Sequence, residues 1–178
     1  DYKIMKKWIN RAIEYVPTES NQIIKLRKCQ KIPLKAYLTN TRKDWRFKMM
    51  CGSGKTRLAI EMIKCTPDIK KTCILVPTVA LLDQWYDTLV KEGIDIGRVC
   101  TNYKENNKNI ICVYNSFPTI SSIKFNRIII DEAHHIKNKS KYKKTYIDKI
   151  IKYVKNVPTV YLSATLKGDI DYEYSITD

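Results

Sequence analysis

A short glycine loop constrains the fold of this chain more than any other stretch of its sequence. The loop is Cys51-Gly52-Ser53-Gly54-Lys55-Thr56. Residues 45–50 before it have the composition of a strand, and residues 56–64 after it place apolar side chains at helical spacing. Glycine leaves backbone N–H groups free to converge on an anion, so a loop of this kind between a strand and a helix is typical of a phosphate site. The sequence therefore predicts an α/β fold with a phosphate site where this strand ends.

The side chains of the loop suit separate roles in nucleotide binding. The Gly52-Ser53-Gly54 run would surround the phosphates with backbone N–H groups. Lys55 would bring a positive charge to the β- and γ-phosphates, and Thr56 would offer a hydroxyl to Mg²⁺. The wider pattern, GxxxxGK followed by Ser or Thr, is incomplete because its first glycine would stand where the chain has Met49. A plain glycine turn before Lys-Thr is therefore the alternative.

A pair of carboxylates follows a second apolar strand. The run Arg127-Ile128-Ile129-Ile130 shows no alternation of polar and apolar residues, which predicts a strand buried on both faces in a parallel sheet. Asp131 comes directly after it and is placed to hold Mg²⁺, directly or through water. Glu132 is suited to act as the general base for an attacking water. A solvated Asp-Glu turn is the alternative, and the glycine loop upstream favours the nucleotide interpretation.

Motifs at these positions resemble those of superfamily 2 helicases and translocases. Asp131-Glu132-Ala133-His134 is similar to motif II of that superfamily, Ser163-Ala164-Thr165 to motif III, and the glycine loop to motif I. The histidine at position 134 resembles the repair-helicase and type III restriction branch rather than the DEAD-box RNA helicases, which carry aspartate there. The resemblance implies the first RecA-like lobe of a P-loop NTPase, with ATP and Mg²⁺ as its ligands.

The resemblance also implies roles for individual residues. Lys55, Glu132 and His134 would take part in ATP hydrolysis. His134, together with Ser163 and Thr165, would couple the nucleotide to bound nucleic acid.

Upstream, Leu26-Arg27-Lys28-Cys29-Gln30 resembles the glutamine motif that reads the adenine base in this superfamily. The resemblance assigns adenine recognition to Gln30, and its amide offers the donor and the acceptor that adenine requires. A glutamine that is merely exposed on an amphipathic helix is the alternative.

Two further segments follow the motif order of the superfamily and would face nucleic acid. A strand that ends at Pro77 and a helix capped by Thr78 are similar to motif Ia, and the N-terminus of that helix can accept a phosphate. Asn115 and Ser116, in a turn that follows residues 110–114, could also contact backbone phosphates. Ordinary α/β packing is the alternative for both segments.

The alternation of strands and helices predicts a doubly wound, mostly parallel sheet flanked by helices. Strands are expected near residues 45–50, 72–76, 97–100, 110–114, 127–131 and 159–163. Two helices are expected before the first of these strands, and further helices near residues 55–65, 78–92 and 141–155. The motifs at the C-terminal ends of the strands should then line one edge of the sheet. We expect residues 1–22 to form a helical lead segment and residues 23–178 to form the ATP-binding domain.

In superfamily 2, ATP lies between two RecA-like lobes, and the second lobe supplies arginine fingers. Only 13 residues follow Thr165, so we expect the second lobe to be absent from this chain and to be needed for efficient turnover. The expected function is that of the ATP-binding lobe of a helicase or translocase, acting on DNA rather than RNA. The alternatives are a P-loop NTPase that does not act on nucleic acid, and a module that binds nucleotide or nucleic acid without turnover.

The net charge of +15 is weak evidence for nucleic-acid binding. A basic surface favours binding to phosphates. The basic residues are 26 Lys and 7 Arg, however, and a surface selected for phosphate or base contacts usually recruits arginine. We therefore expect the lysine run in residues 137–144 to lie on a solvated face.

The six cysteines include no C-x-x-C pair, and the two histidines are adjacent, so the sequence indicates neither zinc nor disulfides. Cys73 and Cys112 fall in predicted buried strands, and Cys51 lies inside the phosphate loop. We expect reduced thiols in an intracellular compartment, nuclear or cytoplasmic, and no membrane partner, since no apolar run is long enough to span a bilayer.

Overall fold

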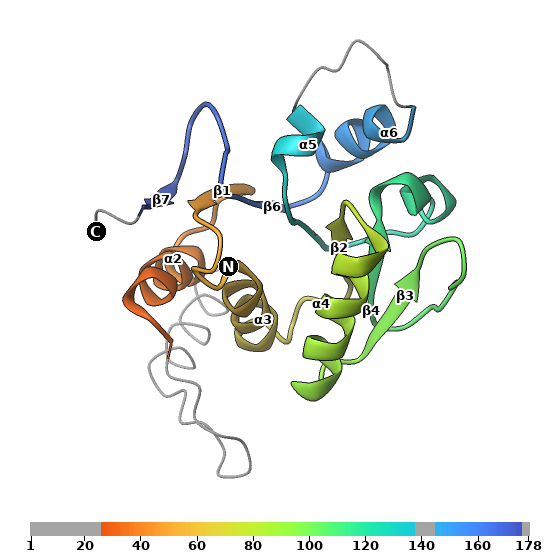
Figure 1. Ribbon diagram of the computed structural model, residues 1–178, viewed down its shortest axis with the longest axis horizontal. Coiled ribbons are helices and arrows are strands. Elements are labelled where there is room, and N and C mark those ends of the chain that lie inside the picture. Colours follow the sequence, from red (N-terminus) through yellow and green to blue (C-terminus); the bar gives the residue numbers. More distant parts are fainter. Residues whose placement is uncertain (1–25, 138–144, 176–178) are drawn as a thin grey trace.

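The computed structural model describes residues 26–137 and 145–175, whose strands form one sheet with helices on both faces (Figure 1). The strands are β1 (Asp44–Met49), β2 (Thr72–Val76), β3 (Ile96–Val99), β4 (Asn109–Val113), β5 (Arg127–Ile130), β6 (Thr159–Ser163) and β7 (Tyr172–Tyr174). Their order across the sheet is β3-β4-β2-β5-β6-β1-β7, and neighbouring strands are parallel throughout. The parallel, doubly wound sheet predicted from the sequence is confirmed.

Helices cover the two faces of the sheet in two groups. The helices are α2 (Lys28–Thr39), α3 (Lys55–Cys65), α4 (Val79–Lys91), α5 (His134–Lys137) and α6 (Thr145–Val154), with a 3₁₀ helix, η1 (Tyr114–Thr119). Buried side chains of α2, α3 and α4 belong to one apolar cluster, whereas those of η1, α5 and α6 belong to another (Figure 1). The two clusters lie on opposite faces of the sheet, because adjacent residues of the central strands fall into different clusters.

The central strand β5 shows this division directly. Ile129 packs with α2, α3 and α4, while Ile128 and Ile130 pack with η1 and α6, and all three are fully buried. The prediction of a strand buried on both faces is therefore confirmed. Cys73 and Cys112 are also fully buried in their strands, as predicted.

Some elements differ from the sequence-based prediction. The six predicted strands lie within two residues of their expected bounds. Three of the described elements were not predicted: β7, which pairs with residues 47–49 of β1, the 3₁₀ helix η1 and the short helix α5. Three residues are too few to show a period, so β7 depends on its neighbour for its conformation. The expected helical segment over residues 1–22 lies outside the described residues, and so does the start of the helix expected over 141–155.

The parallel topology gathers the ends of five strands at one edge of the sheet. The C-terminal ends of β1, β2, β4, β5 and β6 lead to the glycine loop, Pro77, Tyr114, Asp131 and Ser163, respectively. In open α/β sheets this edge is where ligands bind. Among the described helices, none combines the length and the apolar character needed to cross a membrane.

Candidate functional site

The glycine loop begins where β1 ends. Gly52 and Gly54 have φ values of 76° and 87°, in the left-handed region that glycine adopts without strain. A side chain at Gly54 would be strained by this φ, and its Cβ would lie 2.1 Å from Gln30 Nε2, so Gln30 would have to move. Within the loop, Ser53 donates from its backbone N–H and its hydroxyl to the Met50 carbonyl, at 3.3 and 2.7 Å. The helix α3 follows with Lys55 as its first residue.

Met49 occupies the place of the missing pattern glycine without distorting the loop. Its side chain is fully buried in the core below the loop, and its φ is not among the positive values found in the described residues. Its carbonyl accepts a hydrogen bond from Lys55 Nζ at 3.3 Å. Glycine is not required at this position, because no positive φ is needed there and no ligand-facing side chain results.

The start of α2 holds the outer side of the loop. Gln30 Nε2 donates to the carbonyls of Ser53 and Gly54, at 3.3 and 3.2 Å, and Gln30 Oε1 accepts from the Arg27 N–H at 2.8 Å. The Arg27 guanidinium also donates to the Gly52 carbonyl, at 3.2 Å. In a trans peptide the N–H points opposite to the C=O. The N–H groups of Gly54 and Lys55 therefore point away from α2, toward the place a phosphate would take.

Gln30 is 5% exposed, so the alternative of a merely exposed glutamine is wrong. Its amide faces the loop that would hold the phosphates.

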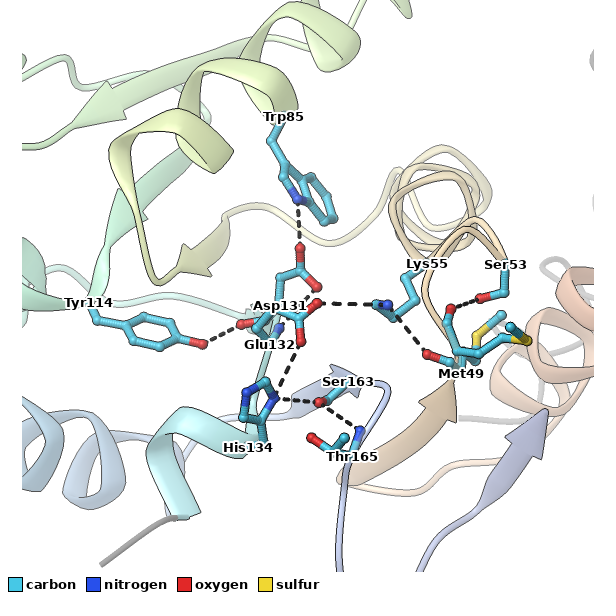
Figure 2. Close-up of polar contacts among 11 residues, drawn as sticks. Met49, Ser53, Lys55, Trp85, Tyr114, Asp131, Glu132, His134, Ser163 and Thr165 are labelled. Carbon is cyan, nitrogen blue, oxygen red and sulfur yellow. Dashed lines mark hydrogen bonds and ion pairs between the residues drawn. The ribbon is translucent and has the colours of Figure 1, made fainter. Parts of the chain in front are cut away.

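Asp131 is held at every polar atom at the end of β5. Trp85 Nε1 donates to its Oδ2 at 2.9 Å, and the Glu132 N–H donates to its Oδ1 at 3.0 Å (Figure 2). Its backbone carbonyl accepts from the Tyr114 hydroxyl, and its N–H donates to the Leu75 carbonyl at 2.9 Å. Burial raises the pKa of Asp131 above its ordinary value, and the Trp85 hydrogen bond acts in the opposite direction.

Glu132 turns its carboxylate from the strand end back toward the loop. Glu132 is the one non-glycine residue in the described chain with a positive φ, which is 48°. Such a strained conformation occurs at functional sites. Glu132 Oε1 lies 3.8 Å from Lys55 Nζ, and Oε2 lies 3.3 Å from His134 Nδ1. Figure 2 shows the glutamate between these two side chains.

His134 continues the chain of contacts to the end of β6. Its Nδ1 lies 2.8 Å from Ser163 Oγ, which also accepts the N–H of Thr165 at 3.2 Å. The structure thus connects Lys55, Glu132, His134 and the Ser163-Ala164-Thr165 turn (Figure 2).

The predicted nucleic-acid residues lie at the same edge of the sheet but farther out. Thr78 is exposed and caps α4, with its Oγ1 accepting the Leu81 N–H at 3.3 Å, as predicted for a helix start. Pro77 is half-buried before it. Asn115 is exposed in η1, and Ser116 Oγ lies 3.4 Å from its Oδ1.

Two contributors to the site, Trp85 and Tyr114, were not singled out in the sequence. Trp85 lies on α4 and Tyr114 opens η1, and both are buried with their polar atoms directed at Asp131. A buried indole N–H or phenol needs a polar partner. That rule could have indicated a contact for each of them, but only the fold identifies the partner.

The residues present fit a Mg²⁺–nucleotide complex. Each Asp131 carboxylate oxygen has one hydrogen-bond donor and so keeps a lone pair for a metal or its water. Thr56, second in α3, is partly exposed and would complete the metal's protein ligands. The N–H groups of the loop, the N-terminus of α3 and Lys55 supply the positive field that phosphates require.

One protein-family model matches this chain over most of its length. The model of the family ResIII, described as "Type III restriction enzyme, res subunit", matches residues 23–168. No curated protein sequence matches the chain significantly.

Solved structures of low sequence identity share the fold. The UvsW helicase from bacteriophage T4 is 18% identical, with a TM-score of 0.63 over 93% of this chain and 61% of that one. A hypothetical ATP-dependent RNA helicase from Sulfolobus tokodaii is 19% identical, with a TM-score of 0.63 over 89% of this chain and 50% of that one. A nuclease-deletion mutant of the Type ISP restriction-modification enzyme LlaGI was solved with a DNA substrate mimic. It is 19% identical, with a TM-score of 0.63 over 79% of this chain and 15% of that one.

This chain therefore spans between 15% and 61% of the length of these three proteins. Its fold is the RecA-like fold of these helicase domains. Because the family model covers most of the sequence, the chain belongs to the ResIII family, that of the type III restriction enzyme res subunit.

Proposed function

We propose that this chain is the first RecA-like lobe of an ATP-dependent helicase or translocase that acts on DNA. The observation that carries the proposal is the continuous series of contacts from the glycine loop through Lys55, Glu132 and His134 to Ser163. Through these contacts a bound nucleotide can affect the conformation of the turn at Thr165. A phosphate-binding loop without a nucleic-acid track would not require it.

The nucleotide would be held by groups with separate roles. The N–H groups of the Gly52-Ser53-Gly54 run and Lys55 bind the phosphates, while Thr56 and Asp131 hold Mg²⁺. Bound Mg²⁺ neutralises charge that develops on the phosphates during transfer. Adenine recognition by Gln30 uses the second lone pair of Oε1, or an exchange of its bonds to the loop.

Glu132 acts as the general base toward the attacking water. Its carboxylate faces Lys55. When the γ-phosphate takes Lys55 as its partner, this ion pair loosens and the carboxylate becomes free to accept a proton from water. His134 lies beside the same carboxylate, so a movement of the carboxylate shifts His134 and, through it, Ser163 and Thr165.

A nucleic-acid track is supported by the position of the exposed helix start, and DNA is favoured by the resemblance that the histidine at position 134 carries. Pro77 and Thr78 at the N-terminus of α4, with Asn115 and Ser116 in η1, would contact backbone phosphates. The LlaGI structure contains a DNA substrate mimic, whereas the Sulfolobus tokodaii protein is described as an RNA helicase. DNA and RNA are therefore both compared in the test.

The test measures ATP hydrolysis by the intact protein with single-stranded DNA, duplex DNA and RNA at one fixed salt concentration, because affinity for nucleic acid depends on salt. We expect DNA to stimulate hydrolysis more than RNA does. The variant Glu132→Gln should keep nucleotide binding and lose hydrolysis by roughly 10²- to 10⁴-fold, the usual contribution of a general base.

Three results would contradict parts of the proposal. Hydrolysis that no nucleic acid stimulates would favour a P-loop NTPase of another kind. Nucleotide binding without hydrolysis in the intact protein would favour a binding module. Stronger stimulation by RNA would reverse the proposed track.

A further inference from the structure

The Asp131 carboxylate is oriented by a side chain that has no assigned role. Trp85 Nε1 donates to Oδ2 at 2.9 Å, while the neighbouring Glu132 N–H donates to Oδ1 at 3.0 Å. The bond to Glu132 joins two adjacent residues of the chain. The bond to Trp85 comes from another element, and a donor on each oxygen fixes the plane of the carboxylate.

The contact is enclosed within the fold. Trp85 is 1% exposed and Asp131 is 4% exposed, so water does not readily replace either partner. The indole packs in the apolar cluster between α4 and the sheet, with Leu82 and Leu89 on the same helix. The position of α4 therefore decides where the indole N–H lies, and the indole decides where the remaining lone pairs of Asp131 point.

The same helix begins at the exposed cap Thr78, two turns before Trp85. On the other side, the Tyr114 hydroxyl donates to the Asp131 carbonyl, and Tyr114 directly precedes the exposed Asn115. Both segments that we assign to nucleic acid are thus attached to Asp131, one at its carboxylate and one at its backbone (Figure 2).

We propose that Trp85 is a positioning residue for the metal-binding carboxylate: its indole N–H aims the lone pairs of Asp131 at Mg²⁺ and ties their direction to α4. This inference rests on the proposed function, because it takes a Mg²⁺–nucleotide complex as the ligand of the site.

The test uses Trp85→Phe in the intact protein, since phenylalanine keeps an aromatic ring and removes the N–H. Trp45→Phe is the matched control, because Trp45 is buried in the same cluster and stacks on Phe47 without contacting Asp131. Binding of a fluorescent ADP analogue is measured across a range of Mg²⁺ concentrations and in the presence of EDTA.

We expect Trp85→Phe to raise the Mg²⁺ concentration needed for half-maximal binding by about tenfold, at the lower end of the effect of residues that orient metal ligands. Binding in EDTA should not change, and Trp45→Phe should alter neither quantity. A purely structural indole would shift both variants alike, or weaken binding equally with and without Mg²⁺. Either result would overturn the inference.

Wild-type tryptophan emission provides a second measurement if Trp85→Phe does not fold. Adding Mg²⁺ to the ADP complex should change the emission, and Trp45→Phe should keep that change. Mg²⁺ binding without an emission change would contradict the inference.

The proposed function is tested separately by Lys55→Ala. Nucleotide binding that does not need Lys55 would overturn the proposed function. Binding that needs Lys55, with an unchanged Mg²⁺ requirement in Trp85→Phe, would overturn only the role of Trp85.

Discussion

Gln30 contacts the glycine loop on the side opposite the expected phosphates. Its amide donates to two consecutive carbonyls of the loop, and through the planar peptides it orients the N–H groups on the opposite side. A role in holding the loop and a role in reading adenine make different predictions for nucleotide selectivity.

Replacing Gln30 with alanine should weaken ATP binding roughly tenfold, since its two hydrogen bonds to the loop, of about 0.5–1.5 kcal/mol each, are lost. If Gln30 also reads adenine, ATP affinity should fall more than GTP affinity. Equal losses for ATP and GTP would contradict adenine recognition and leave the loop-holding role. Isothermal titration with each nucleotide measures the difference, and Lys31→Ala, an exposed change on the same helix, is the control.

Cys51 differs from the other cysteines in its exposure. It is exposed in the glycine loop, whereas the remaining five are buried. Burial raises the pKa of Cys65 to about 11 and that of Cys112 to about 12. A raised pKa leaves little thiolate at pH 8, and the thiolate is the reactive form.

Alkylation by iodoacetamide at pH 8 should therefore modify Cys51 first, and MgATP should slow this reaction by covering the loop. Mass spectrometry of the modified peptides gives the rates. In Lys55→Ala, the same MgATP concentration should give no protection. Modification of Cys51 at one rate with and without saturating MgATP would contradict the assignment of the loop.

At this scale, sequence patterns predicted the residues with a fixed local context. Lys55, Asp131 and Glu132 each stand beside a recognisable strand end or helix start, so their positions followed from neighbours in the chain. The contacts of Trp85 and Tyr114 with Asp131 could not be predicted, because they depend on how separate elements pack. The orientation of Gln30 toward the loop has the same origin.

Arg127 joins several elements at the opposite end of β5 from Asp131. Its buried guanidinium donates to Thr66 Oγ1 at 2.7 Å, to Tyr37 Oη at 3.1 Å and to Thr72 Oγ1 at 3.0 Å. These bonds connect β5 to α2, to the end of α3 and to β2. The neutral acceptors satisfy the hydrogen-bonding groups of the buried guanidinium. Without Arg127 these buried acceptors would lose their donor.

Arg127→Met should reduce the free energy of unfolding by about 2–4 kcal/mol, because buried hydroxyl and carbonyl partners would lose their donor. Urea denaturation measures the change. Arg127→Lys keeps the charge without the planar fork and should give a smaller loss. Nucleotide affinity of the folded protein should stay unchanged; a fall comparable to that of Lys55→Ala would contradict the separation of the two ends of β5.

Elements with a clear period or a clear apolar run were predicted, and short ones were not. The six strands and the helices α3 and α4 carry their own signals in the sequence. The strand β7 is fixed mainly by its pairing with β1 and by Asp171, which accepts from the Arg46 N–H at 2.7 Å and from Arg42. Such stabilisation arises between distant segments and has no local pattern.

At the scale of the whole molecule, the proposal divides the catalytic machinery between two lobes. In the proposed function this chain would supply the groups that bind the phosphates and the metal, while the arginine fingers would come from a second lobe. The chain alone should therefore bind MgATP and hydrolyse it about 10³- to 10⁵-fold more slowly than the intact protein, the range expected for a missing arginine finger.

Steady-state hydrolysis by the two forms gives this ratio, and binding of a fluorescent nucleotide shows that the shorter form has folded. Equal turnover by both forms would contradict a site shared between lobes.

The sheet order also bears on how the protein is made. Among the described strands, β1, which carries the glycine loop, pairs with β6 and β7, so that Asp44 lies opposite Thr159 and Phe47 opposite Tyr172. A ribosome completes β1 long before either partner exists. Long-range parallel pairing of this kind forms slowly and leaves apolar strands exposed in the meantime. The phosphate loop is thus synthesised well before the strands β6 and β7 that flank β1, and a nascent chain should acquire nucleotide binding only after residue 163 has left the ribosome.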